Sequence, residues 1–246
     1  MFWRRERRRA DHAFEAGGRA RITVASPPRN LRATVDYTSL MRILIYDRDC
    51  KGPGPTHWLA HSFRLGVKVF GGARFFDAVI PSESWAQALR GVLCASTHEA
   101  IEEIQFWGHG KWGRALIGEE SLDRAVVTGP GELPDLMKEV GTRMPSPTAT
   151  LWFRTCETLG AQPGQEFARH LSEQIGARVA GHTYIIGPLQ SGLHILPPGE
   201  APSWPAMEGV AVGSVEKPRR AHWSSLTAPN TITCLRRTLP TTLTRG

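Results

Sequence analysis

The chain of 246 residues lacks any long apolar run, so the sequence offers no candidate membrane span. Its first ten residues hold five arginines, and no hydrophobic stretch follows them as it would in a secretory signal. The four cysteines lie far apart, with neither a CxxC pair nor a zinc-ligand spacing. These absences favour a reduced, cytoplasmic protein that has no membrane partner.

Signatures of other enzyme classes are missing too. The chain has no Gly-x-Ser-x-Gly elbow of a serine α/β-hydrolase and no phosphate-binding P-loop. His57 and His61 have a helical i, i+4 spacing, but the glutamate of the HExxH zinc motif is absent and no third ligand is evident. We therefore expect neither a metal nor an organic cofactor.

Acidic charge is scarce at the two ends of the chain. Residues 1–40 carry nine Arg against four acidic residues, and residues 216–246 carry six Lys or Arg against one Glu. These ends account for the net charge of +7, because residues 41–215 are slightly acidic. A nucleic-acid-binding domain has its basic patch on the folded body, so nucleic acid is not the favoured partner. A minor alternative treats the ends as tethers to nucleic acid or to an acidic partner.

The composition divides the chain into three parts. We expect a disordered basic tail over 1–40, an α/β domain over 41–215 and a basic extension over 216–246. Within the domain, short apolar runs alternate with amphipathic segments such as 164–175, which Gly176 ends. This alternation predicts a three-layer α/β sandwich with a mostly parallel central sheet.

Two boundaries in this domain are further expectations. Pro81 and Ser82 are typical of a helix start, and the apolar spacing continues from there to Val92. Thr183 to Ile186 is β-prone and is expected to form a strand.

Two short motifs stand directly after apolar runs. Gly108-His109-Gly110 follows Ile104 to Trp107, and Arg154-Thr155-Cys156-Glu157 follows Ala149 to Phe153. The histidine and the cysteine are 47 positions apart. Ligands of parallel α/β sheets bind outside the carboxyl ends of the strands, and neighbouring strands bring their ends to one edge. The sequence therefore predicts a His–Cys site at that edge.

A thiol and an imidazole at one edge suit acyl transfer. The thiolate is the nucleophilic form of cysteine, and a nearby base such as His109 can take its proton. Gly108 and Gly110 add no bulk beside the histidine, so a substrate backbone can approach it closely. The backbone N–H groups of Gly110 and Cys156 are candidates for an oxyanion hole.

This order of residues resembles the caspase-like cysteine peptidases, which include caspases, legumains, gingipains, separases and bacterial CHAT domains. The blocks Phe106 to Gly110 and Phe153 to Glu157 carry the resemblance, which extends over 42–186 and is nearest in style to bacterial members. It implies a caspase-like fold and a protein or peptide substrate. It also implies His109 as general base or proton donor, Cys156 as nucleophile and Gly110 as an oxyanion donor.

The sequence departs from caspases proper around the nucleophile. The Gln-Ala-Cys-x-Gly block is absent, so specificity for aspartate is not transferred. Arg154, Glu157 and His182 are candidates for a substrate pocket, and His182 equally suits a polar turn. The alternative function is a catalytically inactive caspase-like interaction module, in which Cys156 is a small buried apolar residue.

Overall fold

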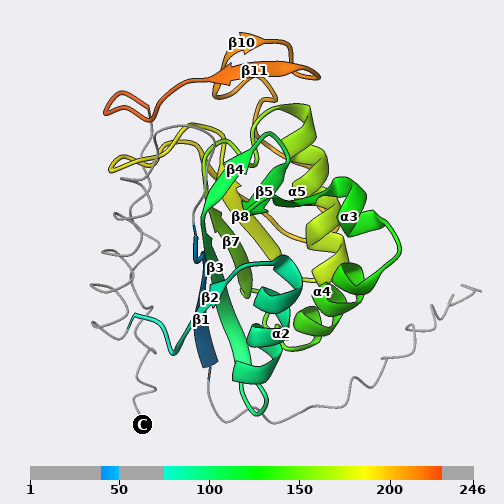
Figure 1. Ribbon diagram of the computed structural model, residues 1–246. Helices are drawn as coiled ribbons and strands as arrows, with labels where there is room; N and C mark the ends of the chain where they lie inside the picture. Colours follow the sequence, from blue (N-terminus) through cyan, green and yellow to red (C-terminus); the bar gives the residue numbers. More distant parts are fainter. Residues whose placement is uncertain (1–39, 50–74, 229–246) are drawn as a thin grey trace, which may run out of the picture. The chain divides into compact units, whose positions relative to one another are not determined.

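The computed structural model describes residues 40–49 and 75–228. The expected tail before Leu40, the His57–His61 pair and residues 229–246 lie outside the described residues. The described chain is a mixed α/β protein built on a six-stranded sheet (Figure 1). The order of its strands is β2-β1-β3-β7-β8-β9. Their bounds are Leu40–Asp47 for β1, Ala78–Ser82 for β2, Ala100–Trp107 for β3, Thr150–Arg154 for β7, Arg178–His182 for β8 and Leu193–Leu196 for β9.

Five of these strands are parallel, and only the edge strand β9 runs antiparallel to its neighbour β8. The mostly parallel sheet predicted from the sequence is thus confirmed. Strands that run parallel in one sheet need crossover connections, and helices lie in the connections from β2 to β3, from β3 to β7 and from β7 to β8. Consequently β3 and β7 are adjacent and end at the same edge.

The described helices lie on one face of this sheet (Figure 1). They are α2 at Trp85–Ala95, α3 at Arg124–Thr128, α4 at Glu132–Thr142 and α5 at Ala161–Ile175. Ser84 caps α2 by accepting a hydrogen bond from the Gln87 N–H. Gly176 ends α5 in the left-handed conformation, as the sequence predicted.

The sheet has two unlike faces because side chains alternate along each strand. The side chains that point toward the helices form one continuous apolar core, which includes Ile43, Ile104 and Phe153. Phe153 lies at its centre and is fully buried, with its ring 5.5 Å from that of Phe167 in α5. This apolar contact holds the helix layer on the sheet.

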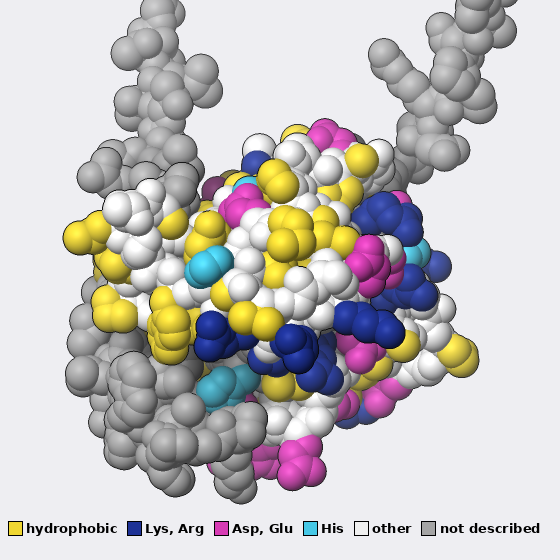
Figure 2. Space-filling view, turned by 90° about the horizontal axis from the view of Figure 1, so that it is seen from above, with side chains coloured by type: hydrophobic (Ala, Val, Ile, Leu, Met, Phe, Trp, Pro, Cys, Tyr) yellow, Lys and Arg dark blue, Asp and Glu magenta, His cyan; other side chains and the backbone are white. Residues whose placement is uncertain are grey.

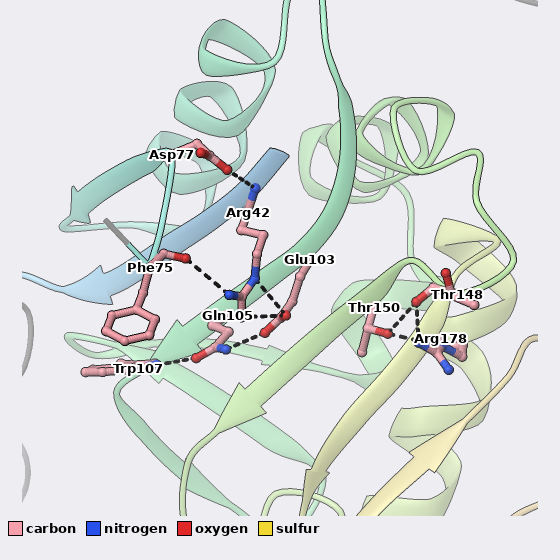
Figure 3. Close-up of polar contacts among 9 residues, drawn as sticks. All are labelled: Arg42, Phe75, Asp77, Glu103, Gln105, Trp107, Thr148, Thr150 and Arg178. Atoms are coloured by element: carbon pink, nitrogen blue, oxygen red, sulfur yellow. Dashed lines mark hydrogen bonds and ion pairs between the residues drawn. The ribbon is translucent and has the colours of Figure 1, made fainter. Parts of the chain in front are cut away.

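The opposite face is polar and aromatic. There Arg42 donates to Glu103 at 2.9 Å, Gln105 donates to Glu103, and the Trp107 indole donates to Gln105 at 2.9 Å (Figure 3). Arg42 is buried, and its guanidinium also donates to the Phe75 carbonyl oxygen. The buried polar groups of this face therefore satisfy one another across β1 and β3.

Two small sheets lie beyond the carboxyl edge of the large one (Figure 1). Strands β4 at His109–Lys111, β5 at Arg114–Ile117 and β6 at Glu120–Asp123 form an antiparallel sheet directly after β3. Strands β10 at Val210–Gly213 and β11 at Pro218–Ala221 form a second pair. β11 falls in the segment expected as a basic extension, and it pairs with the end of the expected domain.

The structure corrects two boundaries. Pro81 and Ser82 do not open a helix; they end β2, and α2 begins at Trp85. Proline is tolerated there because β2 is an edge strand. Thr183 to Ile186 is not a strand of the large sheet, since β8 ends at His182 and only Ile185 makes an isolated bridge, to Trp223.

No helix among residues 40–49 and 75–228 combines the length and the apolar character that crossing a bilayer requires.

Candidate active site at the carboxyl edge

His109 and Cys156 come from the two central strands of the sheet. Trp107 of β3 pairs with Arg154 of β7, and each candidate residue lies two positions beyond that pair. His109 begins β4, whereas Cys156 lies in the loop between β7 and α5. The structure thus brings both residues to one end of the molecule, at the same level of neighbouring strands, as the sequence predicted.

The histidine hairpin packs directly on the cysteine loop. A Cβ atom at Gly110 would lie 2.0 Å from the Thr158 hydroxyl oxygen and 2.7 Å from that of Thr155. Only glycine allows this approach, because a side chain would overlap both threonines. The Gly113 N–H donates to the Thr158 carbonyl oxygen at 2.9 Å and fixes the tip of the hairpin.

The same hairpin explains a misleading pattern in the sequence. Residues 108–113 have the letters G-x-G-x-x-G, which in a dinucleotide-binding turn lead from a strand into a helix. Here they lead from β3 into the turn between β4 and β5. No helix N-terminus follows to receive a pyrophosphate, so this run is not a dinucleotide-binding turn.

Backbone hydrogen bonds fix the loop that carries Cys156. The Glu157 N–H donates to the Tyr184 carbonyl oxygen at 2.9 Å, and the Leu159 N–H donates to that of His182 at 3.0 Å. The thiol of Cys156 donates to the Ile186 carbonyl oxygen at 3.7 Å. The segment that follows β8 therefore supports this loop instead of continuing the sheet.

Glu157 has a left-handed backbone, with a φ of 43°. This conformation is costly for a residue with a Cβ atom and persists only where its surroundings enforce it. Among the described residues the Cys156 N–H, a predicted oxyanion donor, donates no hydrogen bond. The other predicted donor, Gly110, belongs to the strand that packs on this loop.

The thiol of Cys156 is strongly influenced by its surroundings. Burial raises its pKa to about 11, the hydrogen bond to Ile186 opposes that rise, and Glu157 adds to it. Lys111 lowers the pKa. At neutral pH the resting thiol is therefore protonated, and it needs a base to become a nucleophile.

The three candidates for a substrate pocket occupy different environments. Arg154 is half-buried, and its guanidinium lies 4.8 Å from the ring centre of Trp107 and 5.0 Å from that of Trp152. Glu157 is buried and forms an ion pair with Lys111.

His182 is fully buried, and its Nδ1 lies 3.1 Å from the Ser191 carbonyl oxygen. Burial lowers its pKa to about 4, so it is neutral at pH 7. Its Nε2 finds no hydrogen-bond partner in the described chain. The structure thus sets His182 in the interior and not in an open turn.

Lys111 is a member of this site that the sequence analysis missed. Its ammonium nitrogen is 3.2 Å from Glu157 Oε1. The two residues are far apart in the sequence, and only the pairing of β3 with β7 brings them together. A basic residue two positions after the histidine was the one available signal, and alone it predicts nothing.

Lys and Arg side chains gather on this end of the molecule among hydrophobic ones (Figure 2). An open depression of about 390 Å³ lies beside the hairpin. It shares Lys111 with the site, but neither His109 nor Cys156 lines it. The residues that line it are Lys111, Trp112, Gly113, Arg114, Asp123, Arg124, Ala125, Pro163 and Glu166.

Comparisons of the chain with protein-family models, with curated proteins and with solved structures found no match. Its function must therefore be argued from the site itself.

Proposed function

We propose that the chain is a cysteine endopeptidase with a caspase-like fold, and that His109 and Cys156 form its catalytic dyad. One observation carries the proposal: the two residues stand two positions beyond the same register pair of adjacent parallel strands. Ligands of such sheets bind at this edge. The described helices cover one face of the sheet and so form two layers with it. The third layer of the expected three-layer sandwich is therefore part of the same proposal.

The proposed reaction is acyl transfer in two steps. His109 takes the proton of the Cys156 thiol as the sulfur attacks the peptide carbonyl carbon, and the C=O electrons move onto the oxygen. The N–H groups of Gly110 and Cys156 hold this oxyanion. When the C–N bond breaks, His109 gives the proton to the leaving amine. Water then hydrolyses the thioester and restores the thiol. The chemistry needs no metal or organic cofactor.

The protonated resting thiol makes the base essential. Because the pKa of Cys156 is raised to about 11, very little thiolate exists at neutral pH without proton transfer to a neighbour. Replacing His109 should therefore remove nearly all activity and not merely slow it.

The same raised pKa is the observation that favours a second candidate function, the inactive interaction module. In that role Cys156 remains a partly buried thiol and His109 takes no proton from it. Peptide cleavage separates the two functions, and the rate of thiol alkylation reports how readily Cys156 reacts in the resting chain. Cys94 is an internal reference because it is an exposed free cysteine on α2.

The test uses the full chain and a peptide library analysed by mass spectrometry. Cys156→Ala and His109→Ala should each abolish cleavage, whereas Cys94→Ala should leave it unchanged. Circular dichroism should show the same fold in all three variants. Cleavage by Cys156→Ala would overturn the assignment. If the wild-type chain cleaves nothing and Cys156 alkylates more slowly than Cys94 at pH 7.5, the interaction module is the correct function.

A further inference from the structure

An ion pair joins the loops that carry the two candidate catalytic residues. Lys111 stands two positions after His109 in β4, and Glu157 directly follows Cys156. Their charged atoms, Lys111 Nζ and Glu157 Oε1, are 3.2 Å apart. The pair therefore lies beside the dyad and links the two strand ends from which it comes.

The two partners of this ion pair are held very differently. The Glu157 side chain is 5% exposed, and that of Lys111 is 46% exposed. The backbone of Glu157 is fixed by its N–H bond to Tyr184 and by its left-handed φ. Its carboxylate is thus directed by the fold, and the flexible lysine reaches it from the hairpin.

Only one of the two carboxylate oxygens of Glu157 has a partner among the described residues. Oε1 faces Lys111, but Oε2 is buried and has no hydrogen-bond partner among the described residues. A buried carboxylate that is only half satisfied is costly, and a structural role alone does not account for it. Burial also raises the pKa of Glu157, while Lys111 opposes that rise.

The two charges act on the thiol in opposite directions. Glu157 disfavours the thiolate of Cys156 because like charges repel, and Lys111 favours it. The other group that acts on the thiol is the Ile186 carbonyl, from the segment after β8, which accepts its hydrogen bond. Burial accounts for most of the rise in the thiol pKa, and the balance between Lys111 and Glu157 adjusts how readily Cys156 loses its proton.

We propose that Lys111 and Glu157 are positioning residues, which hold the Cys156 loop against the His109 hairpin and set the net charge that the thiol meets. This proposal rests on the proposed function in that Cys156 is taken as the reacting group. The pair itself touches no reacting atom. With both charges present their effects oppose each other, and the thiol stays protonated until a substrate and His109 engage it.

The opposite signs of the two charges make the proposal testable. Removing the charge of Glu157 frees Lys111 to stabilise the thiolate, so Cys156 should become more reactive. Removing the charge of Lys111 leaves Glu157 uncompensated, so Cys156 should become less reactive. A purely structural pair behaves otherwise, because breaking it from either side loosens the same contact.

The experiment measures the rate of Cys156 alkylation by iodoacetamide between pH 6.5 and 9.5, in full-length protein that carries Cys94→Ala. Glu157→Gln should alkylate about three to ten times faster than the parent at pH 7.5, and Lys111→Met should be slower by a similar factor. Lys111→Arg keeps the charge and should restore the parental rate. Lys138→Met and Glu139→Gln, both on the exposed side of α4, are matched controls that should change nothing.

Rates that move in the same direction in Glu157→Gln and Lys111→Met, or that do not move, overturn the proposal. If Lys111→Met does not fold, the double variant Lys111→Met/Glu157→Gln replaces it, and its rate should lie between those of the parent and Glu157→Gln. Alkylation needs no peptidase activity. Opposite shifts in a chain that cleaves no peptide would therefore support the ion-pair proposal and refute the proposed function.

Discussion

The two faces of the central sheet differ in the kind of interaction that their side chains make. The face toward the helices is apolar, with Phe153 and Ile104 buried in a single core. The other face carries a chain of charged, amide and indole groups from Arg42 to Trp107. Apolar burial is non-directional and tolerates small shifts, whereas hydrogen bonds require fixed geometry. We infer that the first face supplies most of the stability and that the second fixes the strands in register.

The largest effect should come from the apolar face. Phe153→Ala removes a fully buried ring that contacts Phe106 and Phe167, and it should lower the free energy of unfolding by about 4 kcal/mol. Urea denaturation followed by circular dichroism measures this loss. Trp223→Ala is the control, because Trp223 is 67% exposed and its loss should cost less than about 0.5 kcal/mol. Equal losses in the two variants would contradict the assignment of stability to this face.

The next effect should come from the polar face. Glu103→Ala leaves the buried guanidinium of Arg42 without its carboxylate, which should cost about 3 kcal/mol in the same assay. The double variant Arg42→Met/Glu103→Leu removes both charges and should recover much of that loss. A double variant no more stable than Glu103→Ala would show that this ion pair is a source of stability in its own right.

A smaller effect on the same face depends on pH. His182 has a pKa of about 4 in the folded chain, against 6.5 when exposed. Between these values the unfolded chain binds the extra proton and the folded chain does not, so stability falls as the pH drops from 6.5 to 4. Between pH 7.5 and pH 4.5 the loss should be on the order of 2 to 3 kcal/mol.

Denaturation at pH 7.5 and pH 4.5 measures the His182 contribution. His182→Gln should lose less stability than the wild type between these two conditions. His98→Gln serves as the control, because His98 is exposed in the turn that follows α2. A wild-type pH dependence in His182→Gln would show that His182 is not the group that titrates.

The smallest effect concerns charges on the solvent-exposed side of the helix layer. Arg169 and Glu173 are an i, i+4 pair on α5, each about half exposed. Glu173→Ala should lower stability by about 0.3 to 0.5 kcal/mol at low salt, and the loss should vanish in 1 M NaCl because salt screens exposed charges. Set against Glu103→Ala, this variant isolates the effect of burial on similar chemistry. A loss that persists in 1 M NaCl would point to packing instead of charge.

Much of the fold could be predicted from local sequence. The apolar runs before His109 and Cys156 indicated β3 and β7, and Gly176 marked the end of α5. Pro81 misled, because a proline at an edge strand and a proline at a helix start look alike in sequence. Thr183 to Ile186 has strand propensity, but its backbone groups bond to the Cys156 loop and to His222 and Ser224.

The candidate site was predictable only in part. The pairing of the two motifs followed from a general rule about parallel sheets. The ion pair of Lys111 with Glu157 did not, since it depends on the exact register of β3 and β7. The burial of His182 also could not be predicted from local sequence. The alternation of side chains along β8 places His182 in the interior beside Trp152, with 6.2 Å between the ring centres.

The segment Tyr184 to Ile186 is hydrogen-bonded to the Cys156 loop through its backbone carbonyl groups. Tyr184 and Ile186 offer carbonyl oxygens to Glu157 and Cys156, and Ile185 exchanges backbone bonds with His222 and Ser224. Peptide groups are the same in nearly every residue type. These three positions can therefore accept many different residues without moving the thiol. Relatives of this chain are better sought by the spacing and direction of its strands than by the letters around its cysteine.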